Sequence, residues 1–239
     1  MSDQMDSLLE PKPEPAKLAA PRDRVIDALM QLAAERRFED ISIRDLATAA
    51  NLSLADFRDL FPSKGAVLGA LNRRLDRAVL SDRSIEMAAQ PARDRLFDVL
   101  MRRLDAMAPY RPGLREIVAW LRRDPLAAAS MNQAMLNSVR FMLEAAGLES
   151  DGVAGALKLQ GLVLTWTRIV DVWLDDSEPE LAKTMAAMDR ELTNGERLVA
   201  GIDQLDRFAS PFKSLARAAM DFGQRARSAR GKGDATSTR

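Results

Sequence analysis

Apolar residues recur three and four positions apart along most of the chain, which is the spacing of helices that bury one face. Glycine and proline fall mainly at the breaks between these stretches, for example at Pro62, Pro125 and Gly147. No stretch alternates apolar and polar residues persuasively enough to favour a β-strand. The pattern therefore predicts an all-α protein.

Two capping signals predict a pair of short helices in the first third of the chain. Asp45 follows Ser42, and Asp56 follows Ser53, as carboxylate forms of the capping box that opens a helix. Asn51 lies between them, and asparagine tolerates the left-handed conformation that a tight turn often requires. Two short helices joined by a turn of about three residues make a helix-turn-helix, whose second helix can enter a DNA major groove. The expected helices are Ile43–Ala49 and Leu54–Phe61.

The chain divides into four expected parts. A proline-rich leader and a basic tail contain too little apolar sequence to fold by themselves. Between them we expect a three-helix head, which contains the helix-turn-helix, and a helical-bundle body. The leader covers residues 1–20, the head 21–80, the body 81–223 and the tail 224–239.

The body is expected to be a succession of amphipathic helices. In the first of them one charge, Arg103, interrupts an otherwise apolar stripe. The expected bounds are Ala92–Ala108, Leu114–Arg123, Leu126–Ala146, Gly152–Leu174 and Glu178 to about Arg197.

Composition argues against an enzyme. Cysteine and histidine are both absent, which removes thiolate nucleophiles, disulfides, Ser-His-Asp triads and almost every transition-metal site. The adjacent acids Asp175 and Asp176 stand at a helix end, where capping explains them better than acid–base catalysis. We therefore expect neither catalysis nor a cofactor.

Charge and targeting signals narrow the remaining classes. Thirty-five basic residues balance 35 acidic ones, so any DNA binding must come from local geometry and not from bulk electrostatics. The leader lacks the basic and apolar regions of a signal peptide, and no stretch is long and apolar enough to span a membrane. A cytoplasmic protein is expected.

The stretch from Arg24 to Val79 resembles the DNA-binding head of the TetR/AcrR family of transcriptional regulators. The resemblance lies in the order and spacing of RRFED, ISIRDLATAANLS and FPSKGAVLGAL. Phe61 to Lys64 match the family's F-P-S/N-K junction, which implies that the lysine region lies against phosphate. The family likeness also implies a palindromic DNA operator, a homodimer and a small-molecule effector. The residues that would form the core of the motif are Ile43, Leu46, Ala47, Ala50 and Leu52.

The second helix of the motif departs from the family pattern. It carries two carboxylates, Asp56 and Asp59, and Arg58 stands where the family has a phosphate-contacting tyrosine. Aspartate can accept a hydrogen bond from cytosine and arginine can read guanine, so base recognition is still open to this helix. Each carboxylate nevertheless opposes the counterion release that supplies much of the affinity for DNA. The expected DNA contacts are Arg24, Arg44, Ser53, Leu54, Asp56, Arg58, Asp59 and Lys64.

Methionine and aromatic residues of the body suggest where an effector would bind. Such side chains form an adaptable wall for an apolar or amphipathic molecule, although they equally suit an ordinary helical core. The expected pocket lining is Met101, Met107, Trp120, Met131, Met135, Phe141, Met142 and Trp166.

Two tryptophans suggest a dimer interface. Trp166 and Trp173 are seven residues apart, which places both indoles on one helical face, where they can anchor a two-fold contact. The expected interface is Trp166, Ile169, Val170 and Trp173.

A second resemblance supports an alternative function. The segment WLDDSEPELAKTMAAMDREL resembles the carboxy-terminal segment of the lipid-binding accessory protein of ubiquinone biosynthesis, a family that shares the TetR fold and has lost DNA binding. The matching positions are Asp176, Ser177, Glu180, Thr184, Met188 and Asp189. This likeness implies a protein that binds a lipid or isoprenoid and no DNA.

Two amphipathic stretches follow, over residues 198–208 and 212–220. Basic residues on the second, such as Lys213 and Arg217, are compatible with contact to a membrane surface, although packing on the body is the commoner explanation. Taken together, the sequence favours a ligand-responsive, DNA-binding transcriptional repressor, with the lipid-binding protein as the alternative.

Overall fold

The computed structural model describes residues 19–81 and 90–197. All regular structure in these two ranges is helical, which confirms the all-α prediction. Within them no helix is both long and apolar enough to cross a membrane. The predictions for the leader up to residue 18, for the amphipathic stretches after residue 197 and for the basic tail lie outside the described residues.

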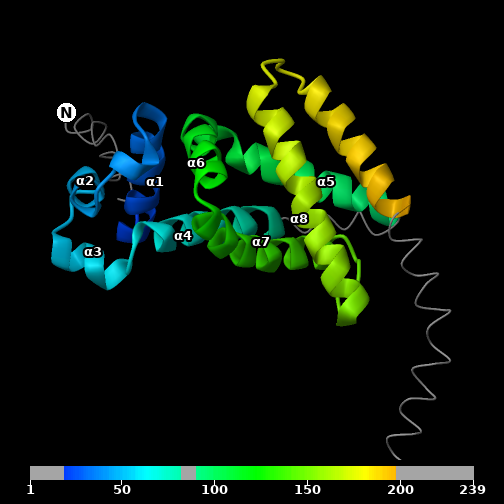
Figure 1. Ribbon diagram of the computed structural model, residues 1–239, viewed down its shortest axis with the longest axis horizontal. Helices are drawn as coiled ribbons and strands as arrows, with labels where there is room; N and C mark the ends of the chain where they lie inside the picture. Colours follow the sequence, from blue (N-terminus) through cyan, green and yellow to red (C-terminus); the bar gives the residue numbers. More distant parts are fainter. Residues whose placement is uncertain (1–18, 82–89, 198–239) are drawn as a thin grey trace, which may run out of the picture. The chain divides into compact units, whose positions relative to one another are not determined.

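The helices belong to two compact units, and Figure 1 labels most of them. The first unit contains α1 (Pro21–Glu35), η1 (Phe38–Asp40), α2 (Ile43–Ala49), α3 (Leu54–Leu60), α4 (Lys64–Leu80) as far as Leu75, η3 (Ala108–Tyr110) and α6 (Arg111–Arg123). The second contains the end of α4, α5 (Ala92–Met107) as far as Ala106, α7 (Pro125–Ala145) from Asn132, α8 (Gly152–Asp175) and a helix over 182–197.

These compact units do not coincide with the predicted division at residues 80 and 81. Residues 107–131 join the first unit, because α6 packs on α1. The approach is so close that a Cβ atom on Gly113 would lie 2.5 Å from the carbonyl oxygen of Met30. In the same unit the rings of Phe38 and Trp120 lie 4.2 Å apart between centroids. Residues that the sequence pattern assigns to the body thus complete the core of the head.

A buried ion pair ties helices together inside the second unit. Arg103 on α5 is only 1% exposed, and its guanidinium bonds the carboxylate of Asp76 on α4. The hydroxyl of Ser138 on α7 donates to the same carboxylate, and the guanidinium lies 5.7 Å from the ring centroid of Trp166 on α8. Burial lowers the pKa of Arg103, and the neighbouring Asp76 opposes that effect. The charge that interrupts the apolar stripe of α5 is therefore a structural element of the core.

The last described helix starts at residue 182, four residues after the predicted start at Glu178. Asp176 is buried and accepts hydrogen bonds from the backbone nitrogen of Thr184 at 2.9 Å and from its hydroxyl at 2.8 Å. Leu181, just before the helix, has a left-handed φ of 51°. Asp176 therefore acts as a cap, and the chain makes an extra turn before the helix begins. In Figure 1 this helix, in yellow and orange, runs beside α8, and Arg168 pairs with Glu191 between the two at 3.1 Å.

Candidate nucleic-acid interface and body cavity

Both predicted capping boxes are present. The Ser42 backbone nitrogen donates to Asp45 at 2.8 Å and the Asp45 backbone nitrogen donates back to the serine hydroxyl at 3.1 Å. Ser53 and Asp56 make the same reciprocal pair at 3.2 and 3.1 Å. Hydrogen bonds from these serines hold the pKa values of both carboxyls below the ordinary range of aspartate. The starts of α2 and α3 are therefore fixed by their own sequence.

The turn between α2 and α3 is tight and well bonded. Asn51 has φ 53°, the left-handed conformation that its sequence position predicted. The backbone nitrogen of Leu52 donates to the carbonyl of Ala47 at 2.9 Å. Arg24 on α1 donates from Nε to the carbonyl of Ala50 at 3.1 Å, which joins the turn to α1. These contacts set the direction in which α3 leaves the turn.

Two phenylalanines hold the inner side of α3. Phe57 and Phe61 are each 1% exposed, and their ring centroids lie 6.1 Å apart. Arg22 on α1 covers Phe61, with its guanidinium 4.4 Å from the ring centroid, and donates to the carbonyl of Leu60 at 2.9 Å. Because its inner side is buried and its end is bonded to α1, α3 is a rigid element.

The outer side of α3 is exposed. Leu54, Ala55, Asp56, Arg58 and Asp59 all lie at the surface, and Arg44 at the start of α2 is exposed as well. Within the described residues Arg44, Arg58 and Asp59 make no ion pair or side-chain hydrogen bond. The helix-turn-helix thus presents a surface of mixed charge, with apolar area from Leu54, that is available to a partner.

Lys64, whose phosphate contact stays a prediction, bonds backbone carbonyl groups within the head. Its ammonium donates to the carbonyl oxygens of Phe38 at 2.9 Å and Ile41 at 2.5 Å and lies 4.7 Å from the centroid of the Phe38 ring. Burial lowers the pKa of Lys64, and the nearby acidic residues only partly offset that effect. Lys64 therefore closes the end of η1 and is not a free cation.

Arg24, another predicted DNA contact, also bonds carbonyl groups within the head, and its contact with DNA stays a prediction. Its Nε bonds Ala50, and one terminal nitrogen donates to the carbonyl of Ala19 at 3.2 Å. The side chain therefore stabilises the turn between α2 and α3. Of the predicted cations, Arg44 and Arg58 are the ones that the exposed surface contains.

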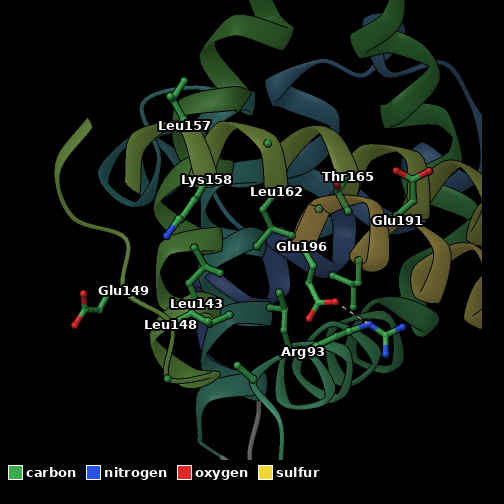
Figure 2. A pocket seen from close by; sticks show the side chains of 16 residues that line it. Arg93, Leu143, Leu148, Glu149, Leu157, Lys158, Leu162, Thr165, Glu191 and Glu196 are labelled. Carbon is green, nitrogen blue, oxygen red and sulfur yellow. Dashed lines mark ion pairs between the residues drawn. The ribbon is translucent and has the colours of Figure 1, made fainter. Parts of the chain in front are cut away.

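The second unit contains a cavity of about 660 Å³, shown in Figure 2. Its walls come from the start of α5, the end of α7 and the following loop, α8, and the last described helix. They consist of leucines, alanine and glycines, with one threonine and five charged residues. The lining residues are Ala92, Arg93, Leu96, Leu143, Gly147, Leu148, Glu149, Leu157, Lys158, Gly161, Leu162, Thr165, Glu191, Leu192, Gly195 and Glu196.

This cavity is not the predicted pocket, because none of the eight residues predicted to line a pocket belongs to its wall. Phe141 is 56% exposed. Trp120 packs on Phe38 within the first unit. For all eight residues, which are Met101, Met107, Trp120, Met131, Met135, Phe141, Met142 and Trp166, contact with an effector stays a prediction. The sequence signal for this cavity is the pair of glycines inside helices, Gly161 and Gly195, because the leucines of the wall are scattered along the chain.

The predicted dimer residues lie inside one chain. Trp166, Ile169, Val170 and Trp173 are all buried, with Trp173 only 1% exposed. Their seven-residue spacing does place them on one face of α8, but that face contacts the core of its own chain. The exposed face of α8 carries Leu157 and Leu164 instead, each 55% exposed. The four named residues are therefore corrected as interface residues.

Comparisons with family models and with curated proteins gave no match. Comparison with solved structures gave matches. The chain is similar to a TetR transcriptional regulator from Nitrosomonas europaea, with a TM-score of 0.60 and 23% identity over 74% of this chain and 98% of that one. It is also similar to a TetR transcriptional regulator from Rhodococcus sp. RHA1, with a TM-score of 0.50 and 22% identity over 73% of this chain and 97% of that one. The chain therefore has the TetR-type fold.

Proposed function

We propose that this protein is a DNA-binding transcriptional regulator of the TetR type. The observation that carries the proposal is the state of α3, whose inner side is fixed by Phe57 and Phe61 and whose outer side is exposed. A rigid helix with a free outer side is what reading a major groove requires. Nothing in the fold itself needs Arg58 and Asp59 at the surface.

The mixed charge of α3 favours recognition by base contacts over recognition by bulk attraction. Arg58 can donate to the acceptors of a guanine, and Asp59 can accept from a cytosine amino group. The exposed side chain of Leu54 can contact the methyl group of a thymine. Because Lys64 and Arg24 bond carbonyl groups, few of the predicted cations in the described head remain for phosphate. The DNA affinity should therefore be modest and should depend less on salt than that of a basic head.

A gel-shift titration with the DNA upstream of the protein's own gene tests the proposal. Wild-type protein should shift this DNA at low salt, and Arg58→Ala should weaken specific binding by about 1 to 3 kcal/mol. Asp59→Asn should strengthen non-specific binding and steepen its salt dependence, because one repulsive charge near the phosphates is removed. Both residues are exposed, so thermal unfolding should be unchanged in either variant. Absence of any shift with all three proteins would refute DNA binding.

The same regulator is proposed to act as a homodimer with a small-molecule effector. A single short recognition helix reads only a half-site, so two copies are needed for an operator. Exposed Leu164 on α8 and Met185 on the last described helix offer apolar surface for a second copy. The cavity of the second unit lies within the range of about 300 to 1,000 Å³ that is usual for small-molecule sites. Repression is the mode of action we propose.

One observation favours a lipid-binding protein without DNA binding as the second candidate. The outer side of α3 has two carboxylates against one cation, and the body contains a cavity with mostly aliphatic walls. Native mass spectrometry of gently purified protein separates the candidates when it is combined with the gel shift. A co-purified lipid together with no DNA shift would favour the second candidate.

A further inference from the structure

Two glycines of the second unit stand where the helices do not need them. Gly161 lies inside α8 and Gly195 inside the helix over 182–197. Glycine is among the least favourable residues in a helix interior, because it loses the most backbone freedom on folding. Neither glycine has a left-handed φ, and a Cβ atom added to either would meet no atom within 4 Å. Within the described residues, neither turn geometry nor helix packing explains them.

Both glycines line the same cavity. They lie on different helices, yet each faces the space between α5, α8 and the last described helix. Side chains at these positions would project into that space and reduce it. The shared location indicates that the cavity volume itself is what the two glycines preserve.

The interior of the cavity suits an aliphatic chain. The buried residues of its wall are leucines, namely Leu96, Leu143, Leu162 and Leu192. Among the described residues no aromatic side chain lines it, so within this part of the chain a planar ring finds no partner for stacking. Aliphatic walls and the absence of an aromatic surface favour a flexible hydrocarbon chain.

One end of the cavity offers a hydrogen-bond donor. Arg93 lines the cavity, and its Nε is buried without a hydrogen-bond partner in the described part of the chain. One terminal nitrogen, Nη2, donates to the Asp189 carboxylate and lies 3.2 Å from the hydroxyl of Thr193, and the other, Nη1, lies 3.6 Å from the carboxylate of Asp94. Figure 2 shows Glu196 directed toward Arg93, with 3.9 Å between its carboxylate and Nε, which is too long for a hydrogen bond. An oxygen acceptor on a ligand would satisfy this donor.

The charges around Arg93 decide which oxygen fits. Asp94, Asp189 and Glu196 already offset the guanidinium, so a carboxylate on the ligand would face three like charges. A cationic group would face Arg93 itself. Glu191, also in the wall, is paired with Arg168 at 3.1 Å. An uncharged oxygen, such as that of an alcohol or a ketone, meets neither repulsion.

From these contacts we infer that the cavity binds an aliphatic molecule with an uncharged oxygen at one end, held by the Nε of Arg93 and accommodated by Gly161 and Gly195. This deepens the effector half of the proposed function and, for its regulatory meaning, rests on it. The site differs from the methionine-lined pocket that the sequence predicts.

Calorimetric titration of the full-length protein with three decyl compounds tests the inference. Decan-1-ol, decanoate and decylammonium share one tail and differ in the head group. Decan-1-ol should bind about tenfold more tightly than either charged compound, because only it satisfies the Arg93 donor without repulsion. Equal binding of all three would overturn the inference, since it would indicate simple partition into apolar surface.

A second test of the inference uses substitutions that fill the cavity. Gly161→Leu and Gly195→Leu should each reduce decan-1-ol affinity by about tenfold or more, because the new side chain occupies the space of the ligand. Ala156→Leu and Ala186→Leu are matched controls, since these alanines are exposed on the same two helices and do not line the cavity. The controls should bind like wild type. All four proteins should fold, because leucine favours a helix and no described atom lies within 4 Å of a Cβ at either glycine.

Sedimentation of the same variants tests whether a second copy of the chain, and not a ligand, occupies the cavity. If Gly161→Leu abolishes self-association and leaves decan-1-ol binding intact, the glycines serve a second copy of the chain and the inference fails. Because these measurements use no DNA, a failed gel shift leaves the inference standing, and a failed titration leaves DNA binding standing.

Discussion

At the scale of single residues, the basic side chains of the head are of two kinds. Lys64 and Arg24 bond carbonyl groups inside the head, whereas Arg44 and Arg58 are exposed and free of ion pairs within the described residues. Sequence spacing does not distinguish the two kinds, because the carbonyls that Lys64 bonds lie more than twenty residues earlier in the chain. A motif match therefore places a lysine at a junction without telling whether its ammonium faces phosphate or protein.

This division predicts opposite effects on stability and on DNA binding for one lysine substitution and one arginine substitution. Lys64→Ala should lower the free energy of unfolding by about 2 kcal/mol, because charge-assisted hydrogen bonds to the end of η1 are lost. It should leave the salt dependence of DNA binding unchanged. Arg44→Ala should leave stability unchanged and reduce the slope of the salt dependence by about one.

Urea unfolding and DNA titrations over a range of salt concentrations measure the two effects. If Lys64→Ala were as stable as wild type and reduced the salt slope, Lys64 would be a phosphate contact after all.

At the scale of helices, local signals are reliable and distant ones are not. The starts of α2 and α3 follow from serine and aspartate pairs three residues apart, and both were predicted from the sequence. The start of the last described helix was not, because its cap acts from Asp176 to Thr184 across a left-handed residue. The charge inside the apolar stripe of α5 was visible in the sequence, but its partner Asp76 comes from α4 and is itself bonded by Ser138 on α7.

The cap at Asp176 predicts a pH-dependent stability. Burial alone would raise the pKa of this carboxyl, but hydrogen bonds from Thr184 and from the backbone of Glu178 outweigh burial and lower the pKa below its ordinary value. A lowered pKa in the folded state contributes stability above the unfolded pKa of about 3.9 and loses it as pH falls through the folded value. Asp176→Asn should therefore be less stable than wild type at neutral pH, and the difference should shrink below a pH of about 4.

Thermal unfolding of both proteins across this pH range provides the measurement. Glu180→Gln, an exposed neighbour, is the control and should follow wild type at every pH. A stability difference that stayed constant down to the lowest pH would show that the charge of Asp176 is not what stabilises the turn.

At the scale of the whole molecule, the sequence identifies which residues of α8 share a face but not what that face contacts. Apolar residues seven positions apart suit a core and a dimer interface equally well, and the structure assigns Trp166 and Trp173 to the core. The cavity was missed for a related reason. Its walls come from four parts of the chain, and the sequence does not show that these parts lie together.

The proposed dimer predicts different outcomes for two glutamate substitutions on α8. Leu164→Glu should yield a folded monomer, because it places a charge in an apolar contact between copies while the side chain is 55% exposed in one chain. Trp173→Glu should instead reduce folding, because its position is 1% exposed within the chain. Sedimentation at micromolar concentration and circular dichroism distinguish the two results. A Leu164→Glu protein that still dimerises would place the interface elsewhere.

The contribution of α6 to the first unit has a consequence for how the protein is made. During synthesis, residues 19–81 leave the ribosome before α6 exists, so the surfaces of Phe38 and Met30 that Trp120 and Gly113 cover are exposed to solvent or chaperones in the meantime. Helix α3 can form early from its own cap, but the first unit, which contains it, is complete only when residue 131 has been added. A gene fragment that stops at residue 80 would therefore encode a head without its α6 wall, and such a fragment is a poor donor for grafting this DNA-binding surface onto another protein.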